Sequence, residues 1–477
     1  MRRSRKVKIL ATLGPASSDQ ATIAGLFRAG ADVFRINMSH SSHDLLRQLV
    51  AAIRAVESDE GRPIAVLVDL QGPKLRIGTF ADHDVVLTPG QTFILDSRST
   101  PGDSERVELP HPEVLAALEL GQRLLLDDGR VRLRVKERTK TRAVTIVEAG
   151  GALSDRKGVA IPDTTAAFSG LTAKDRGDLE AALNAGADWI AQSFIQRAED
   201  LAEVRKVARG HAWVLAKIEK PQAVNRLPDI IDNADALMVA RGDLGVELPL
   251  EQVPGIQKRI TRAARSAGKP VVVATQMLES MIHSPVPTRA EVSDVATAVF
   301  EGADAVMLSA ESAVGDFPDG AIATMDRIAK EVERDPFYPG IIHAQRTDPE
   351  PTSADAISAA ARTVAETLNL AAIVCYTGSG ATGMRAARER PQRQVIALTP
   401  NPATGRRLAL VWGLHCVLTA DAQDLDDMVD RACRIAFQEG FASSGQRIII
   451  SAGVPLGTPG ATNMLRIAFV GGHSDGV

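Results

Sequence analysis

Charged and hydroxyl side chains follow four apolar runs in the middle of the chain, each at the point where the run ends. The runs are WVLAKIEKP (213–221), ALMVARGDLGVELP (236–249), VVVATQMLES (271–280) and DAVMLSAES (304–312). Their ends carry Lys217, Glu219, Arg241, Asp243 and Thr275. Barrels of parallel strands build their active sites at the carboxyl ends of the strands, so this pattern predicts an enzyme.

Glu219 and Asp243 are a candidate pair of metal ligands, because they follow consecutive strands and can point into the same barrel mouth. Mg²⁺ prefers one or two protein carboxylates together with water and substrate oxygens. The alternative is that Glu219 forms a surface ion pair with Lys220 or Arg241. The neighbouring Lys217 and Asp243 favour the metal site.

Lys217 precedes Glu219 by two residues and should therefore lie on the same face of its strand. A buried lysine beside Mg²⁺ can stabilise negative charge on a phosphoryl group during transfer. The alternative is a lysine that reaches out to solvent at the barrel rim. Thr275, at the end of the next strand, could orient or relay a proton, although threonine is common at strand ends.

The second strand-like run ends in FRINMSH, where Arg35, Asn37 and Ser39 alternate and share one side. An arginine fork suits a phosphate or a carboxylate, and Asn37 and Ser39 offer neutral oxygens. His40 follows without any metal-ligand spacing, so a packing role is as compatible with the sequence as a catalytic one.

The third run ends in DLQGPKLRIG, where Asp69 adds a carboxylate and Lys74 and Arg76 add cations. The predicted mouth therefore gathers acids, bases and an Mg²⁺ site. Such a set indicates phosphoryl chemistry.

Composition sets limits on partners and location. The net charge of −4 comes from 55 basic and 59 acidic residues mixed along 477, so we expect neither nucleic acid nor membrane as a partner. Three cysteines without C-x-x-C spacing argue against disulfides or zinc and favour a reducing cytoplasm. The basic start lacks the apolar region of a secretory signal, and no run approaches the ~18 apolar residues of a spanning helix.

Eight strand-like runs alternate with helical patterns and predict a TIM (β/α)8 barrel. The four runs not yet quoted in full lie at 8–14, 32–37, 64–70 and 187–194. Helical patterns lie at 44–56, 174–186 and 256–268, and glycine ends the last two.

Two further regions interrupt or follow the barrel. Residues 78–160 are β-rich with Pro-Gly, Asp-Gly and Gly-Gly turns, and predict a small β-barrel lid domain inserted between 1–77 and 161–340. After a polar stretch at 334–356, α/β alternation resumes and predicts a C-terminal open-sheet domain over 350–477.

In the C-terminal region a strand runs through a loop into a helix. The loop contains Thr377, Ser379, Gly380 and Thr382. Backbone N–H groups and hydroxyls at a helix start can bind phosphate. The alternative is a tight structural turn.

These motifs closely resemble the pyruvate kinase family over nearly the whole chain. The matching segments, in the family's order and spacing, are AKIEKPQAV, MVARGDLGVELP, ATQMLESMI, PTRAEVSDVATAV and GADAVMLSAES. The resemblance implies phosphoryl transfer from phosphoenolpyruvate to ADP, giving pyruvate and ATP. It implies one Mg²⁺ held by Glu219 and Asp243 and a second Mg²⁺ that enters with ADP.

The resemblance also implies individual roles. Lys217 matches the lysine that stabilises the transition state, Arg35 the phosphate-binding arginine, and Thr275, Asp243 and the Gly242 backbone the group that holds the substrate. The positions that match nucleotide contacts are Asn37, His40, Arg76 and Lys157. The positions that match a potassium site are Asn37, Ser39, Asp69 and the carbonyl of Leu70.

Three residues depart from the potassium-dependent pattern. Lys74 stands where those members have glutamate, and Leu70 and Gln71 stand where they have threonine and lysine. A lysine ammonium can supply the positive charge that K⁺ would otherwise provide. We therefore expect activity without K⁺.

The family resemblance further implies a homotetramer and a phosphorylated allosteric effector, a sugar phosphate or AMP, bound at the 377–382 loop. Two other readings remain open. One is another Mg²⁺-dependent, enolate-forming barrel enzyme that acts on pyruvate or an oxoacid. The other is a non-catalytic sensor of phosphorylated metabolites.

Overall fold

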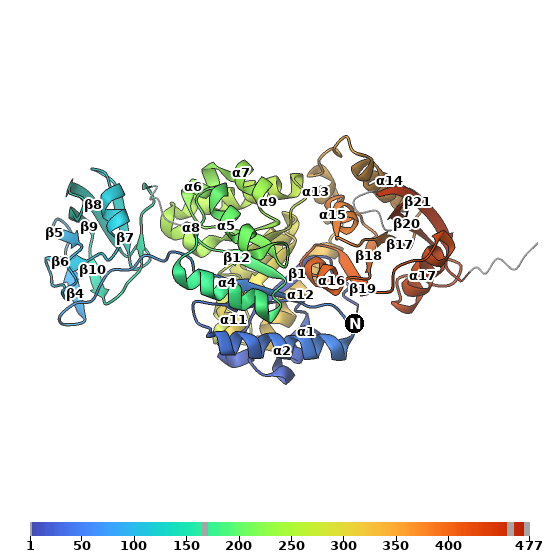
Figure 1. Ribbon diagram of the computed structural model, residues 1–477, viewed down its shortest axis with the longest axis horizontal. Helices are drawn as coiled ribbons and strands as arrows, with labels where there is room; N and C mark the ends of the chain where they lie inside the picture. Colours follow the sequence, from blue (N-terminus) through green and yellow to red (C-terminus); the bar gives the residue numbers. More distant parts are fainter. Residues whose placement is uncertain (1, 165–169, 456–461, 472–477) are drawn as a thin grey trace, which may run out of the picture.

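The computed structural model describes residues 2–164, 170–455 and 462–471. Three bodies of secondary structure follow one another along the longest axis of the molecule (Figure 1). The β strands between residues 84 and 160 lie at one end, a barrel lies in the centre, and a second α/β sheet lies at the other end. Of the C-terminal region predicted for 350–477, the stretches 456–461 and 472–477 lie outside the described residues.

The central body is a closed barrel of eight parallel strands, as the sequence predicts. Its strands are β1 (Lys8–Thr12), β2 (Val33–Asn37), β3 (Ala65–Asp69), β12 (Trp189–Gln192), β13 (Trp213–Ile218), β14 (Ala236–Ala240), β15 (Val271–Ala274) and β16 (Ala305–Leu308). They are neighbours in chain order, and β16 closes the ring beside β1. All eight predicted runs are therefore strands of one barrel.

The helices around the barrel begin and end with local sequence signals. The predicted patterns correspond to α2 (His43–Glu60), α4 (Ala173–Ala185) and α9 (Val253–Ser266). Thr172 caps α4 through a reciprocal hydrogen-bond pair with Asp175, and Gly186 ends it with a φ of +86°. The remaining barrel helices are α1 (Gln20–Ala29), α5 (Ala198–Ala208), α6 (Pro221–Asn225), α7 (Leu227–Asn233), α8 (Arg241–Glu247), α10 (Arg289–Phe300), α11 (Ala310–Ala313), α12 (Pro318–Arg334) and α13 (Tyr338–Ala344).

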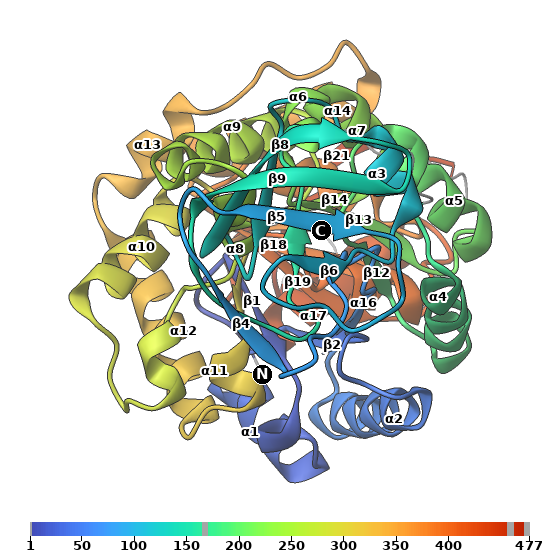
Figure 2. The same cartoon turned by 90° about the vertical axis from the view of Figure 1, so that its left-hand side faces the viewer.

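The predicted small β barrel is built from a six-stranded mixed sheet and a two-stranded antiparallel ribbon around one apolar core. The strands are β4 (Asp84–Leu87), β5 (Thr92–Asp96), β6 (Arg106–Glu108), β7 (Arg123–Leu126), β8 (Val131–Arg138), β9 (Arg142–Ala149), β10 (Gly151–Ser154) and β11 (Val159–Ala160). A short helix, α3 (Pro112–Ala117), was not predicted. Figure 2 looks at this body from its free end and shows β5, β8 and β9 in front of the barrel, with the barrel helices arranged around them.

The C-terminal body is an open sheet in the order β19-β18-β17-β20-β21. Its strands are β17 (Ala372–Tyr376), β18 (Gln394–Thr399), β19 (Leu414–Leu418), β20 (Arg447–Gly453) and β21 (Thr462–Phe469). Its helices are α14 (Ser353–Thr367), α15 (Ala381–Arg388), α16 (Pro402–Leu408) and α17 (Leu425–Gln438). The first four strands are parallel, as predicted, whereas the edge strand β21 is antiparallel and was not predicted.

The two ends of the barrel differ in how they are covered. Ala409 and Leu410 of the C-terminal body join the apolar cluster inside the barrel, and the Trp189 indole N–H donates to the Arg407 carbonyl at 3.2 Å. The amino-terminal end of the barrel is thereby sealed.

No helix among the described residues is both long enough and apolar enough to cross a bilayer.

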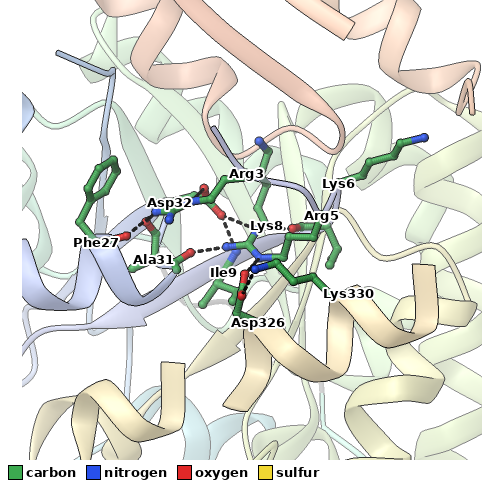
Figure 3. A network of polar contacts seen from close by, with 12 residues as sticks. Arg3, Arg5, Lys6, Lys8, Ile9, Phe27, Ala31, Asp32, Asp326 and Lys330 are labelled. Carbon is green, nitrogen blue, oxygen red and sulfur yellow. Dashed lines mark hydrogen bonds and ion pairs between the residues drawn. The ribbon is translucent and has the colours of Figure 1, made fainter. Parts of the chain in front are cut away.

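A buried network of charges lies at this sealed end (Figure 3). Asp32 accepts from Arg5 Nη1 at 2.7 Å and from Arg3 Nε at 3.3 Å. Arg5 Nε also pairs with Asp326 of α12 at 2.8 Å. The network fastens the segment before β1 to the barrel.

Candidate active site

Strand alternation explains why charged residues collect at the open end of the barrel. On β2, β3 and β13, the apolar residues Val33, Leu67 and Leu215 belong to the cluster inside the barrel. Two residues further along each strand come Arg35, Asp69 and Lys217, which therefore share the inward face. The inward face is apolar in the middle of the barrel and charged at its carboxyl end.

Lys217 is the centre of this charged layer. Its ammonium lies 2.8 Å from Glu219 Oε1 and 3.2 Å from Asp69 Oδ1, and it donates to Ser193 Oγ at 2.8 Å. The Lys217 side chain is 11% exposed, so the alternative of a solvent-reaching rim lysine is wrong. Burial disfavours its charge, but Asp69 and Glu219 outweigh burial and hold the pKa of Lys217 above its ordinary value. Lys217 is therefore a fixed positive charge.

Glu219 is a buried carboxylate whose negative charge is only partly neutralised by its neighbours. Its Oε2 accepts the Phe194 backbone N–H at 2.7 Å. Burial, together with the nearby charge of Asp243, raises the pKa of Glu219 to about 7 despite the Lys217 ammonium. A further cation at this carboxylate would stabilise its ionised form.

The ion-pair alternative for Glu219 is wrong as it was stated. Lys220 pairs with Glu247, and Arg241 pairs with Asp294 at 2.7 Å. Both cations named in that alternative therefore have other partners, and the lysine beside Glu219 is Lys217.

Glu219 and Asp243 line one small cleft of about 50 Å³, which we call the central cleft. Lys74 lines it as well, together with Leu125, Asp128 and Gly158 of the inserted β body. Within the described residues no group of three or more His, Cys, Asp or Glu side chains forms a metal cage. Two carboxylates in a cleft with room for substrate oxygens fit Mg²⁺, which does not require a full protein cage.

Arg35 stands beside a second, larger cavity of about 550 Å³, which we call the rim cavity. Its Nε donates to Asp69 Oδ2 at 2.7 Å and its Nη1 to Thr12 Oγ1 at 3.1 Å. Asn37 and His40 line the same cavity. Its apolar walls come from Leu13, Pro15, Leu45, Leu49, Ala310, Ala313 and Val314.

Thr275 holds a turn together at the end of β15. Its backbone has a φ of +70°, which is rare for threonine. Its hydroxyl accepts the Gly242 N–H at 2.8 Å and donates to the Ala274 carbonyl at 2.6 Å. Arg241 reinforces the turn through the carbonyls of Ala274 and Thr275. The hydrogen bond between the Thr275 hydroxyl and the Gly242 N–H fixes Gly242, which precedes Asp243, at the start of α8.

The predicted potassium positions lie at or just beyond the ends of β2 and β3. Asn37 and Asp69 face each other on β2 and β3. Asn37 Oδ1 accepts the Ser39 N–H at 3.0 Å, whereas the Leu70 carbonyl accepts from Ser193 Oγ at 2.8 Å.

Arg76 and Lys157 lie near the inserted body and do not line either cavity. Arg76 Nη1 donates to the Arg156 carbonyl at 3.0 Å, and the Lys157 ammonium pairs with Asp127 at 2.8 Å. Asn37 and His40 therefore line one cavity, whereas Arg76 and Lys157 line neither of the two.

In the 377–382 loop, two of the predicted hydroxyls are used internally. Thr377 Oγ1 accepts the Gly380 N–H at 2.9 Å, and Thr382 Oγ1 lies 2.8 Å from Thr462 Oγ1. Gly380 has a φ of +97° and caps α15. Ser379 is exposed at the loop tip.

Three contributors to the site were missed from the sequence. Ser193 binds both Lys217 and the Leu70 carbonyl, the Phe194 N–H binds Glu219, and Thr12 binds Arg35. Ser193 and Phe194 follow β12, and Thr12 ends β1. The rule that polar residues at barrel strand ends are functional would have found Ser193 and Thr12.

Comparisons with known proteins identify the family and a shared fold. Residues 4–322 match the family model described as pyruvate kinase, barrel domain, and residues 355–468 match that described as pyruvate kinase, alpha/beta domain. A pyruvate kinase of Methylorubrum extorquens is 63% identical over 98% of both chains, and one of Agrobacterium vitis is 46% identical over 99% of this chain and all of its own. The crystal structure of a pyruvate kinase from Cryptosporidium parvum superposes with a TM-score of 0.92 at 30% identity, covering 98% of this chain and 96% of that one.

Proposed function

The chain belongs to the pyruvate kinase family, and we propose that it transfers the phosphoryl group of phosphoenolpyruvate to ADP, giving pyruvate and ATP. The observation that carries the proposal is the Lys217 ammonium held between Asp69 and Glu219 beside a cleft that Asp243 also lines. This arrangement offers a fixed positive charge and two metal-binding oxygens at one point.

Glu219 and Asp243 would hold Mg²⁺, which when bound supplies neutralisation of negative charge on the substrate. Lys217 faces the same region and stabilises the equatorial oxygens of the phosphoryl group as charge redistributes over them. Its pairing with two carboxylates keeps it protonated and in place, so little reorganisation is needed during transfer.

Arg35 binds the phosphate of the substrate. Asp69 and Thr12 hold its guanidinium by Nε and Nη1, which fixes the orientation of the fork before substrate arrives. Thr275 and the Gly242 backbone hold the rest of the substrate. The hydrogen bond between them sets the position of the turn that leads to Asp243.

The nucleotide occupies the rim cavity. Its volume of about 550 Å³ and its apolar walls suit a purine base, and Asn37 and His40 supply polar contacts at its edge. ADP enters as its Mg²⁺ complex. Closure of the inserted β body as a lid would carry Arg76 and Lys157 to the phosphates and exclude water.

We also propose that the enzyme works without K⁺. Lys74 lines the central cleft with Glu219 and Asp243. Its ammonium there would supply the positive charge that a monovalent cation at the predicted potassium positions would otherwise supply. Assays in sodium and in tetramethylammonium salts test this, and a large rate increase on adding K⁺ would reject it.

Three wider features of the proposal come from the family. The protein is a cytoplasmic homotetramer, and a sugar phosphate or AMP binds at the 377–382 loop, where Ser379 is exposed. Ser379→Glu should abolish that response by placing a negative charge where the phosphate binds. An unchanged response would put the effector elsewhere.

The decisive experiment couples pyruvate formation to lactate dehydrogenase with phosphoenolpyruvate and ADP as substrates. Glu219→Gln should raise the Mg²⁺ concentration needed for half-maximal activity steeply, whereas the exposed Glu251→Gln should not. Absence of ADP-dependent pyruvate formation would reject the kinase in favour of an enolate-forming enzyme that acts on pyruvate or another oxoacid. Unchanged Mg²⁺ titration would remove Glu219 from the metal site.

A further inference from the structure

Asp243, one of the two proposed metal ligands, lies on a short helix. The helix α8 begins directly after β14 and has seven residues. A helix this short makes few hydrogen bonds of its own and depends on contacts with its surroundings. The position of Asp243 relative to Glu219 therefore depends on what holds α8 against the end of β13.

The first such contact lies at the start of α8. The Gly242 N–H donates to the Thr275 hydroxyl at 2.8 Å, which ties the helix to the turn after β15. In the barrel, β15 lies on one side of β14 and β13 lies on the other. A second contact is needed to hold the helix toward β13, the strand that leads to Glu219.

An ion pair between Lys220 and Glu247 provides this second contact. Lys220 follows Glu219 directly, and Glu247 ends α8 four residues after Asp243. Residues four apart in a helix lie on the same side of it, so Glu247 and Asp243 share one side of α8. Each member of the pair is thus closely tied to one of the two metal ligands.

Burial restricts the movement of this pair. Only 12% of the Lys220 side chain and 5% of the Glu247 side chain are exposed. The Lys220 ammonium also lies 5.7 Å from the centre of the Phe194 ring, and the Phe194 N–H donates to Glu219 Oε2 at 2.7 Å. A buried pair resists separation, because the loss of one partner leaves the other charge unpaired in the interior.

Glu247 lines the central cleft together with Glu219 and Asp243, so a third metal ligand is the alternative role for it. Its pairing with Lys220 argues against that role, because the ammonium already neutralises its charge. No group of three acidic side chains suited to a metal occurs in the part of the chain that the structure describes. The pair thus also keeps a third carboxylate from competing for the metal.

We propose that Lys220 and Glu247 are positioning residues for the metal site. Their ion pair holds α8 against the turn between β13 and α6 and so sets the separation of Glu219 and Asp243. Thr275 fixes the start of the helix and the ion pair fixes its end. The inference rests on the proposed function, because it requires that Glu219 and Asp243 bind Mg²⁺.

Binding of Mn²⁺ to the full chain without substrates, measured by electron paramagnetic resonance of the free ion, tests the proposal. Lys220→Met should weaken this binding about tenfold or more, because α8 loses the contact that holds its end. Electrostatics alone predicts the opposite, since the variant removes a positive charge close to the metal. Tighter or unchanged binding by Lys220→Met overturns the proposal.

Three further variants complete the comparison. Glu247→Gln should weaken Mn²⁺ binding as Lys220→Met does, whereas Lys220→Arg keeps the ion pair and should retain most of the affinity. Lys258→Met is the matched control, since Lys258 forms an ion pair with Glu301 at 3.3 Å and neither residue lines the central cleft. An equal loss of affinity in the control overturns the proposal.

Thermal unfolding separates positioning from a purely structural role. A purely structural pair would lower the Tm of Lys220→Met and leave the Kd for Mn²⁺ unchanged at temperatures where the variant is folded, and that result overturns the proposal. Glu219→Gln separates it from the proposed function. If Glu219→Gln does not weaken Mn²⁺ binding, the proposed metal site fails and this inference fails with it. If Glu219→Gln weakens it and Lys220→Met does not, the inference alone fails.

Discussion

The two ends of the barrel each carry a buried cluster of ion pairs, and the clusters differ in how completely their charges are balanced. At the sealed end, Arg3, Arg5 and the Ile9 N–H surround the carboxylate of Asp32. Burial alone would raise the pKa of Asp32, but Arg5 and Arg3 hold it far below its usual value. At the open end, burial and Asp243 leave the pKa of Glu219 at about 7 in spite of Lys217. The neighbouring cations outweigh burial at Asp32, whereas they do not outweigh it at Glu219.

This difference separates structural charge from functional charge within one fold. A balanced buried network resists removal of any member, because each change leaves an unpaired charge in the interior. An unbalanced site reduces stability until its ligand binds, which is a common cost of function. We therefore expect removal of the Asp32 carboxylate at the sealed end to reduce stability and substitutions at the mouth to reduce catalysis.

Lys217→Met should have the largest effect of any substitution proposed at the mouth. Turnover should fall about 10³-fold or more, because the lost charge acts chiefly on the transition state. The KM for phosphoenolpyruvate should change much less, since Arg35 keeps its own partners Asp69 and Thr12. Steady-state kinetics with the exposed Lys136→Met as control measures both constants. Comparable losses in kcat and in affinity would contradict the role assigned to Lys217.

Asp32→Asn is the corresponding test at the sealed end. It leaves Arg3 and Arg5 buried with one carboxylate fewer, and should lower the free energy of unfolding by about 3–5 kcal/mol. Asp44→Asn, on the surface of α2, should change it by no more than about 0.5 kcal/mol. Denaturant titration measures both. At a temperature where the variant is folded, its kcat should equal that of the parent, and a matching loss of kcat would erase the distinction between the two ends.

Much of the mouth could be predicted from the sequence because strand alternation and barrel geometry act locally. Lys217 and Glu219 lie two residues apart, and the rule that places both on the inward face needs no other part of the chain. The sealed-end network was not predicted. Arg5 and Asp326 are more than 300 positions apart, and only the closure of the barrel brings them together.

The residues predicted to contact the nucleotide show the same limit of prediction from local sequence. Asn37 and His40 lie at and just beyond the end of one strand and share the rim cavity, whereas Arg76 and Lys157 make their contacts with Arg156 and Asp127 of the inserted body. The ion-pair partner of a charged side chain also depends on the fold. Glu219 pairs with Lys217, whereas the adjacent Lys220, which caps α6, pairs with Glu247.

Lys74→Glu tests whether charge balance at the mouth can be transferred to an external ion. The substitution removes a cation from the central cleft and adds a carboxylate, so activity without K⁺ should fall roughly tenfold or more. Added K⁺ should restore a large part of it, whereas the parent should respond little. Lys136→Glu, on the exposed face of β8, controls for net charge. Loss of activity that K⁺ does not relieve would show that Lys74 acts in some other way.

A further expected effect at the sealed end depends on pH and is absent at neutral pH. Lys8 is buried there and donates to the Leu414 carbonyl at 2.7 Å. Burial lowers the pKa of Lys8 from 10.5 to about 8, although Asp32 opposes the shift. Between these two values the unfolded chain binds the proton that the folded chain has released, so the contribution of Lys8 to stability rises with pH.

Lys8→Met removes this titration and leaves the other groups of the network in place. The difference in unfolding free energy between parent and variant should therefore shift in favour of the parent by up to ~1.4 kcal/mol per pH unit as the pH rises from 8 toward 10.5. Below pH 8 the difference should be constant, because Lys8 is protonated in both states. Urea titrations of both proteins at several pH values measure it, and titration of Lys6, which is common to both, cancels. A difference that stays flat above pH 8 would mean that Asp32 holds Lys8 charged, and that the sealed end is balanced more completely than its burial indicates.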